Sequence, residues 1–157
     1  MVNNFQRPGA VSNADVGSAF EMTAREWFAN QGIRLQRNYG VEIGLSSTKV
    51  RKFDLGASEP AVLVECKSHK WTSGGNVPSA KTTVWNESMY FFLLAPAGFR
   101  KVLFVLRDFS DKRGESLAEY YVRNHSHLIP DDVEILEYDA SDSTVAVSHT
   151  APVRTPR

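Results

Sequence analysis

The chain has 157 residues, enough for one ordinary domain, and 42% of them are hydrophobic and 23% charged, as in globular proteins with a core. Lys and Arg together number 18, and so do Asp and Glu, so no overall charge attracts the chain to nucleic acid. The single cysteine excludes an internal disulfide framework, and the sequence shows neither an apolar run long enough to span a membrane nor the apolar segment of a signal peptide. We therefore expect a cytoplasmic protein that, if it binds nucleic acid, gathers its basic residues on one face.

The pattern of apolar residues divides the chain into helices and strands. Apolar residues at helical spacing between Phe20 and Phe28 predict a first helix that starts near Gly17, with Asp15 as its cap, and ends at Gly32. Turn-rich segments separate the later elements, which we expect to be strands 33–43, 48–55 and 61–67, helix 79–95, strand 100–108, helix 110–125 and strand 132–139. Residues 1–15 and 148–157 are expected to be flexible ends of a single domain that spans residues 1–157.

This order predicts an α/β fold with a mixed central sheet. The turns between the first three strands are short, which favours antiparallel pairing, whereas a helix precedes each of the last two strands. Helices are then expected on both faces of the sheet. In the helix 79–95, the residues expected to face the core are Val84, Trp85, Ser88, Met89, Phe92 and Leu93.

The third expected strand ends in a charged triplet. Its apolar run, residues 61–64, is typical of a buried strand, yet Glu65-Cys66-Lys67 follows directly. Because side chains alternate along a strand, Glu65 and Lys67 share one face, while Cys66 points to the other and is expected to pack in the core. Charged groups at the end of a buried strand must be paired or bind a metal, since burying them alone is costly.

A second carboxylate, Asp54, lies at the end of the preceding strand. If the two strands pair through the turn GASEP, Asp54 lies beside Glu65, and two adjacent carboxylates repel each other unless a cation separates them. Oxygen ligands suit Mg²⁺, which takes one or two carboxylates, a carbonyl and waters. Lys67 would then be close enough to hold or deprotonate a water, or to offset charge on a phosphate. The alternative is a strand-end ion pair between Glu65 and Lys67, which contributes little if exposed.

These features resemble the PD-(D/E)XK nuclease superfamily. The resemblance rests on Asp54, Glu65 and Lys67, on two neighbouring strands, and on the order helix, three strands, helix, strand over residues 17–108. The segment GSAFEMTAREWFANQG is similar to the first helix of many of these nucleases, with Gly, Glu, Ala, an aromatic residue and Gly in turn. Phe53 stands where the family name has proline, as in divergent members. Beyond residue 108 the likeness is looser and extends to about residue 139.

The resemblance implies a restriction-endonuclease-like core and an enzyme that uses Mg²⁺, or Mn²⁺ in its place, to hydrolyse phosphodiester bonds. It implies that Asp54, Glu65 and the backbone carbonyl of Cys66 hold the metal, with Glu21 of the first helix touching it through water. Asp54, Glu65, Lys67 and Glu21 are then the catalytic residues. The family often places Lys or Gln near the scissile phosphate at the start of the next helix, and Lys81 matches that position.

Several of these residues have an alternative role. Ser68, His69 and Trp71 either line a substrate groove or belong to an ordinary loop, and Lys81 is either a phosphate contact or an exposed lysine. Glu21 could instead face solvent, with Glu26 as the rival carboxylate of the helix. His125 and His127 fit a helix end better than a metal pair. Three groups of basic residues are each more often solvated surface than phosphate contacts: Arg34 and Arg37; Lys49, Arg51 and Lys52; Arg100 and Lys101.

The sequence favours a DNA endonuclease, because the resemblance is to a group dominated by DNA cleavage and repair enzymes. An RNA or tRNA nuclease of the toxin type is the alternative enzyme. A catalytically silent module that binds nucleic acid or protein, or an accessory protein of a mobile element, remains open because fold does not fix function. One small domain reaches one scissile phosphate at a time, so cleavage of both strands would require a homodimer.

Overall fold

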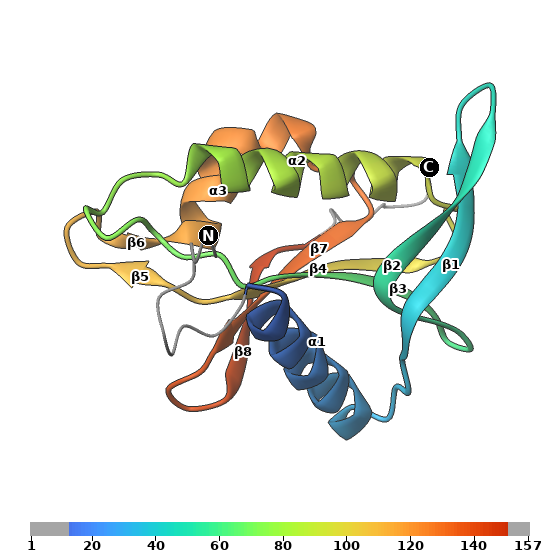
Figure 1. Ribbon diagram of the computed structural model, residues 1–157, viewed down its shortest axis with the longest axis horizontal. Coiled ribbons are helices and arrows are strands. Elements are labelled where there is room, and N and C mark those ends of the chain that lie inside the picture. The colour runs from blue at the N-terminus through green and yellow to red at the C-terminus, as the bar shows by residue number, and fades with distance from the viewer. Residues whose placement is uncertain (1–12, 151–157) are drawn as a thin grey trace, which may run out of the picture.

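The computed structural model describes residues 13–150, so most of the two ends expected to be flexible lies outside the described residues. Figure 1 shows a six-stranded sheet with α1 on one face and α2 and α3 on the other. The elements are α1 (Asn13–Asn30), β1 (Gln36–Gly44), β2 (Thr48–Ser58), β3 (Ala61–Lys67), α2 (Ser79–Leu94), β4 (Arg100–Leu106), β5 (Phe109–Ser110), β6 (Glu115–Ser116), α3 (Leu117–His125), η1 (Ser126–Leu128), β7 (Val133–Asp139) and β8 (Thr144–His149). None of the helices in this part of the chain is long and apolar enough to cross a membrane.

The sheet is mixed, as the sequence predicts. Its strand order is β1-β2-β3-β4-β7-β8. The pairs β1–β2, β2–β3 and β7–β8 are antiparallel, whereas β3, β4 and β7 run parallel. The predicted order of elements is confirmed, and β3 has the predicted bounds. The structure thus shows a mixed α/β fold, while the finer likeness to restriction endonucleases stays a prediction.

Several predicted boundaries are wrong. β1 begins at Gln36 and not at residue 33, and β4 ends at Leu106 and not at residue 108. β2 runs on to Ser58, so residues 56–58 of the expected turn GASEP belong to the strand, and Asp54 lies inside the strand and not at its end.

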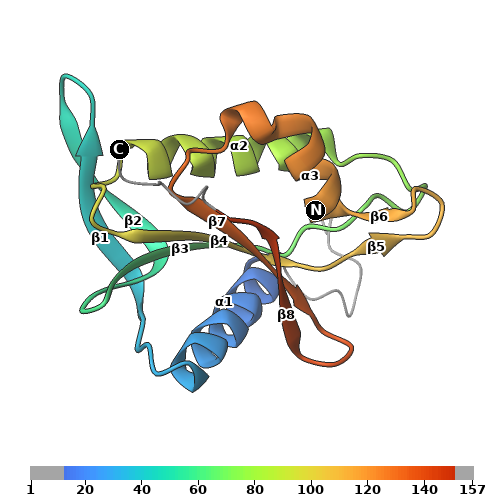
Figure 2. The same ribbon diagram turned by 180° about the vertical axis from the view of Figure 1, so that it is seen from behind.

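Residues 13–15 belong to α1, so Asp15 lies in its first turn, and residues 148–149 belong to β8, a strand that was not expected. Residues 109–116 form the small hairpin β5–β6, seen from behind in Figure 2, so α3 begins only at Leu117. Ser116 sets this start because its side chain accepts a hydrogen bond from the Glu119 amide while the Glu119 carboxylate accepts one from the Ser116 amide.

The sheet separates two apolar cores. Leu63 of β3 faces the core beneath α2 and α3, and Val64 faces the core beneath α1. The helix residues that fill these cores are Trp85, Met89, Phe92, Leu117 and Tyr121 on one side and Phe20, Ala24 and Phe28 on the other. Val84 and Leu93, expected to face the core, are instead 40% and 61% exposed. Only one stripe of α2 meets the sheet, and these two residues lie outside it.

β2 twists sharply at Asp54, and this twist positions the residues of the candidate site. Phe53 packs in the core beneath α2, whereas Leu55, two residues later, packs in the core beneath α1. Residues two apart on a regular strand share a face, so the strand twists sharply between them. On the neighbouring strand, Asn38 has a positive φ of 53° between residues paired with Phe53 and Leu55. Asp54 therefore does not follow the regular alternation of side chains between the two faces of the sheet.

Candidate active site

The twist brings Asp54 against the end of β3. The last residue pair between β2 and β3 is Leu55 with Val64, which leaves Asp54 next to Glu65. The backbone N–H of Cys66 donates a hydrogen bond of 2.8 Å to Asp54 Oδ2. Asp54 is thus anchored to the strand that carries Glu65, and the predicted proximity of the two residues is confirmed.

Glu65 is buried, 1% exposed, with two cations near it. Arg51 Nη2 lies 3.1 Å from Glu65 Oε1, and Lys67 Nζ lies 3.7 Å from Oε2. Burial raises the pKa of the Glu65 carboxyl from 4.5 to about 7, and the charge of Asp54 and a hydrogen bond between the two carboxyl groups act in the same direction, while Lys67 and Arg51 oppose them. The Glu65–Lys67 ion pair therefore exists, but it is not an exposed surface pair, and the two cations only partly offset the burial of this carboxylate.

Arg51 is a site residue that the sequence analysis did not select. Its guanidinium carbon lies 4.2 Å from the centre of the Phe91 ring on α2, so the side chain is held between that helix and Glu65. Within the described residues its Nε atom is buried without a hydrogen-bond partner. The sequence shows Arg51 only as one of three basic residues in a strand, and its pairing with Glu65 depends on the packing of α2. The sequence held an indirect indication of this pairing, because a carboxylate buried at a strand end, such as Glu65, needs a positively charged or hydrogen-bonding partner.

Cys66 is surrounded by carboxylates from three elements. Burial raises the pKa of its thiol, and the charges of Asp54 of β2, Glu21 of α1 and neighbouring Glu65 raise it further. The side chain packs against the core beneath α1, as predicted. The role of its carbonyl as a metal ligand stays a prediction. Because all three act on the same thiol, the carboxyl groups of Glu21, Asp54 and Glu65 lie close together around Cys66.

Glu21, and not Glu26, is the α1 carboxylate on this side. Arg37 Nη2 lies 2.8 Å from Glu21 Oε2 and also donates a hydrogen bond of 3.0 Å to Ser18 Oγ. Glu26 lies apart, beside a different hollow that Trp27 of the same helix also lines. The helix therefore presents to the site the carboxylate that the sequence resemblance selects.

A cavity of about 440 Å³ opens in front of these residues. It lies between α1, the end of β3, the loop that follows and the first turns of α2. Its lining residues are Val16, Gly17, Glu21, Asp54, Cys66, Lys67, Ser68, His69, Lys70, Lys81 and Val84. Glu65 lies behind this wall, and Lys70 is a lining residue that the sequence analysis did not name. The cavity lining thus combines the carboxylates of Glu21 and Asp54 with three lysines, Lys67, Lys70 and Lys81.

No protein-family model, curated protein or solved structure matches this chain. The case for a metal therefore rests on the donor set. Between residues 13 and 150 there is no group of three or more His, Cys, Asp and Glu side chains placed to hold an ion. Mg²⁺ commonly takes one or two carboxylates and completes its shell with waters and carbonyls, so Asp54, Glu65 and the Cys66 carbonyl suffice in kind. Their all-oxygen chemistry fits a hard cation, which would also offset the repulsion between the Asp54 and Glu65 carboxylates.

Trp71 does not reach the cavity, contrary to the expectation that it lines the groove. The ring is buried in the core beneath α2 and α3, and its Nε1–H donates a hydrogen bond of 2.9 Å to the Asp108 carbonyl. The Trp71 amide donates to Asp108 Oδ2 at 2.8 Å. These two bonds tie the loop after β3 to the end of β4. Trp71 therefore supports the loop that carries Ser68 and His69.

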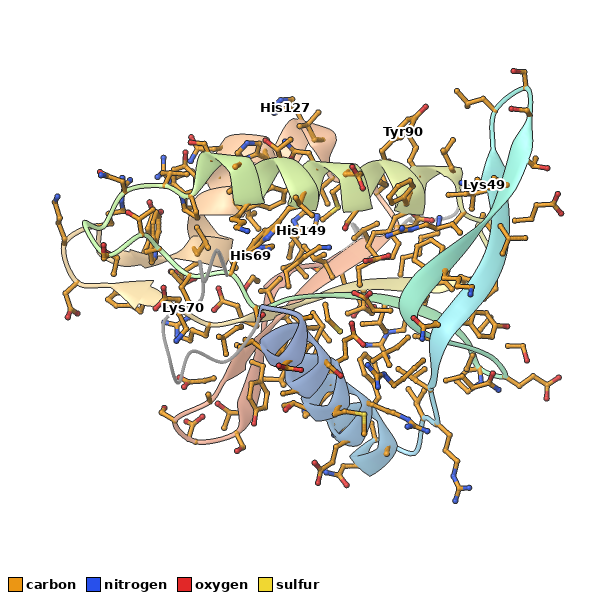
Figure 3. The ribbon with its side chains drawn as sticks, in the orientation of Figure 1. Lys49, His69, Lys70, Tyr90, His127 and His149 are labelled. Atoms are coloured by element: carbon orange, nitrogen blue, oxygen red, sulfur yellow. The ribbon has the colours of Figure 1, made fainter. Side chains whose placement is uncertain are left out.

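The two histidines at the end of α3 are remote from this cavity. The ring of His125 stacks on Tyr121 with ring centres 4.8 Å apart, and His127 lies in the short helix η1. Figure 3 shows His127 above α2, whereas His69 lies below that helix. Their placement at a helix end agrees with the interpretation that the sequence favours.

Proposed function

We propose that the protein is a metal-dependent nuclease that hydrolyses phosphodiester bonds, with Asp54, Glu65, Lys67 and Glu21 in its catalytic site. The observation that carries the proposal is the place of the Asp54 carboxylate, which accepts a hydrogen bond from the Cys66 N–H, beside buried Glu65 at the end of β3, next to Lys67 and a cavity. A structural ion pair would not need a second carboxylate whose charge disfavours ionisation of the first. The αβββαβ order supports a restriction-endonuclease-like fold as part of the same proposal.

Mg²⁺ or Mn²⁺ would be held by Asp54, Glu65 and the Cys66 carbonyl, with Glu21 contributing through water. A divalent cation at this place supplies Lewis-acid polarisation of a phosphate and lowers the pKa of a bound water. Arg51 contacts Glu65 Oε1, one of the two oxygen atoms that such a cation could use. The side chains present can therefore hold the ion, in competition with one arginine.

The lysines of the cavity account for the substrate side of the reaction. Lys67 is 11% exposed and held 3.7 Å from Glu65, so its ammonium group is positioned to hold an attacking water or to stabilise the charge that grows on a phosphate. Lys81 is exposed in the first turn of α2, and Lys70 follows His69 in the loop. Their charges would bind the phosphates of a nucleic-acid backbone. DNA is the proposed substrate, from the resemblance to DNA enzymes, and a homodimer would cleave both strands.

The test is a cleavage assay on supercoiled plasmid, linear duplex, single-stranded DNA and tRNA, each with Mg²⁺, Mn²⁺ or EDTA. We expect nicking or cutting of DNA by the native protein in the presence of metal, and none with EDTA or in Asp54→Asn. Glu26→Gln is the matched control, because it removes a carboxylate from α1 outside the cavity, and it should cleave normally. Cleavage of tRNA alone would replace the DNA proposal with the RNA alternative. Absence of cleavage on all four substrates would favour a binding module.

A further inference from the structure

His69 is held by a hydrogen bond that determines where its proton lies. Trp85 Nε1 of α2 lies 2.8 Å from His69 Nδ1, and an indole N–H only donates, so Nδ1 must be the acceptor with a free lone pair. The one proton of the neutral ring is therefore on Nε2. An imidazolium would place a second N–H against the indole N–H, so this hydrogen bond and a positive charge on His69 exclude each other.

The surroundings of the ring support the same state. Trp85 is fully buried, and its ring lies nearly parallel to that of His69, with centres 6.4 Å apart and planes at 26°. Burial lowers the pKa of His69 to about 4, and Lys67 and Lys81 act in the same direction. A half-buried ring among ammonium groups is more stable when uncharged. The hydrogen bond from Trp85 and the lowered pKa therefore both favour a neutral His69 near pH 7.

The Nε2–H group is the free polar atom of this ring. His69 lines the cavity together with Lys67 and Lys81, and no acceptor among residues 13–150 takes the Nε2 hydrogen. Figure 3 places His69 between α2 and α1, where the cavity lies. The lysines of the cavity attract an anion but leave its orientation free, because an ammonium group is a compact charge on a long stem. The His69 ring is held in place by buried Trp85, so its Nε2–H group can orient a bound anion.

We propose that His69, oriented by Trp85, is a neutral hydrogen-bond donor that binds a non-bridging phosphate oxygen of the substrate through Nε2–H. The proposal rests on the nuclease function proposed above and assigns the substrate contact of that same cavity. A metal ligand or a general base at Nε2 would need a lone pair there and hence a proton on Nδ1, where Trp85 already donates. His69 therefore neither ligates metal nor takes the proton of the attacking water.

The first part of the test reads the tautomer without any nucleic acid. Nitrogen NMR shifts of the histidine rings, assigned with a His69→Gln sample, are expected to show His69 protonated on Nε2 and unprotonated on Nδ1 from pH 5 to pH 8. Trp85→Phe removes the donor, so the preference for the proton on Nε2 should weaken and Nδ1 should become partly protonated, while burial, Lys67 and Lys81 still keep the pKa of His69 below its ordinary value. A native His69 that is cationic near pH 6, or protonated on Nδ1, would overturn the proposal.

The second part measures binding of a labelled DNA duplex with Ca²⁺ in place of Mg²⁺. His69→Ala should weaken binding about tenfold, because it removes a hydrogen bond to a charged acceptor. Gln carries an N–H group at a similar reach, so His69→Gln should retain most of the affinity, with a ratio to the native protein that is constant across this pH range. Equal binding by His69→Ala, or a native advantage that grows below pH 6.5, would contradict a neutral donor.

Cleavage with Mg²⁺ in the same preparations separates the two proposals. Native protein that cleaves DNA while His69→Ala binds as well as native would defeat the role of His69 and leave the nuclease intact. Native protein that neither binds nor cleaves nucleic acid would defeat both, whatever tautomer the NMR shifts show.

Discussion

Two glutamates of the same sheet are almost equally buried, but their carboxylate oxygens differ in their hydrogen-bond and ion-pair partners. Glu65 at the end of β3 is 1% exposed, and Glu137 in β7 is 2% exposed. Glu137 is bonded on both oxygens, because Arg107 Nη1 lies 2.6 Å from its Oε2 and the Ser116 hydroxyl donates to its Oε1. Glu65 has Arg51 at 3.1 Å, Lys67 only at 3.7 Å, and the Asp54 carboxyl beside it. Burial alone therefore does not distinguish the two residues.

The difference lies in what each carboxylate still lacks. The bonds of Glu137 join β7 to the cap of α3, and they leave neither oxygen free, which is the pattern of a structural ion pair. Glu65 lies beside the like charge of Asp54, its two cations are farther away than the Arg107 of Glu137, and a cavity lies next to it. Titratable groups in such surroundings cluster at functional sites. We therefore propose that Glu137 serves stability and Glu65 serves the chemistry of the proposed site, and each prediction below tests that assignment.

The largest effect is expected from Lys67. Lys67→Ala should lower turnover by a factor on the order of 100 or more while metal binding remains, because a positioned group acts on the reaction and an ammonium does not ligate a cation. Lys101 is the matched control, since it is also buried and paired with a carboxylate, Asp132 at 2.7 Å. Lys101→Met should lower stability and leave turnover per folded molecule unchanged. Normal turnover in Lys67→Ala would mean that the lysine only pairs with Glu65.

Lys67→Arg separates charge from proton transfer. Arginine keeps the positive charge, but it does not give up a proton, and its planar fork differs from a compact ammonium. Substantial turnover in this variant would show that Lys67 acts as a charge, whereas loss comparable to Lys67→Ala would show that a positive charge alone does not suffice.

For the free energy of unfolding, we expect the larger loss from substitution of Glu137 and the smaller from substitution of Glu65. Glu137→Gln removes the closest carboxylate partner of Arg107, which keeps only Asp139, 3.9 Å from its Nε. We expect the free energy of unfolding to fall by about 3 kcal/mol, at the low end for a broken buried pair because Arg107 is 30% exposed. Glu65→Gln should be close to neutral or stabilising at pH 8, because it removes a like charge from beside Asp54. Urea unfolding at pH 8 in EDTA measures both. A larger loss in Glu65→Gln than in Glu137→Gln would reverse the assignment.

The pH dependence of stability sharpens the same contrast. The pKa of Glu65 is raised from 4.5 to about 7, so between these values the folded state holds a proton that the unfolded state has released. The resulting stability is complete below pH 4.5 and is lost as the pH rises through 7, by on the order of 3 kcal/mol. His69, with its pKa lowered to about 4, acts in the opposite sense over a similar range, so the native curve alone hides the effect.

The free energy of unfolding of the native protein minus that of Glu65→Gln isolates the contribution of Glu65. In EDTA this difference should fall steadily between pH 4.5 and pH 8. Parallel curves for the two proteins would show that Glu65 is already fully neutralised by Arg51 and Lys67.

The smallest effect is expected from Arg51. Arg51→Met removes a competitor for the Glu65 oxygens, so Mn²⁺ should bind more tightly, by up to about tenfold, or about 1.4 kcal/mol. Lys52→Met, at the exposed neighbouring position, is the control for loss of one positive charge. Weaker Mn²⁺ binding in Arg51→Met than in the control would instead show that Arg51 holds Glu65 in the orientation that the metal needs.

The sequence predicts the parts of this site that depend on local pattern. The apolar run 61–64 and the triplet after it give the bounds of β3, and the predicted antiparallel pairing of this strand with the one before it places Asp54 near Glu65. The alternation rule then fails at Asp54, because β2 twists there to place Phe53 and Leu55 in different cores, a bend that no local pattern in β2 indicates. Regular alternation would have kept Phe53 and Leu55 on one face.

The partners that complete the site come from distant segments. Arg51 meets Glu65 because Phe91 of α2 holds its guanidinium, and His69 meets Trp85 across 16 residues of sequence. Trp71 turns into the core because Asp108, 37 residues later, accepts both of its N–H groups. These contacts depend on how α2 and β4 pack, which single-sequence periodicity does not contain. The bounds of β3 and the proximity of Asp54 and Glu65 were therefore predictable, whereas the distant partners of the site residues were not.

Calorimetric titration of Mn²⁺ into native protein, Glu65→Gln and Glu137→Gln tests the central claim most directly. Circular dichroism first establishes that all three are folded at the temperature used. The account predicts that native protein and Glu137→Gln bind Mn²⁺ with similar affinity, while Glu65→Gln loses binding because it lacks one of the two carboxylates that hold the ion. Unchanged Mn²⁺ affinity in Glu65→Gln, or no binding by the native protein, would contradict the claim that Asp54 and Glu65 form a cation site.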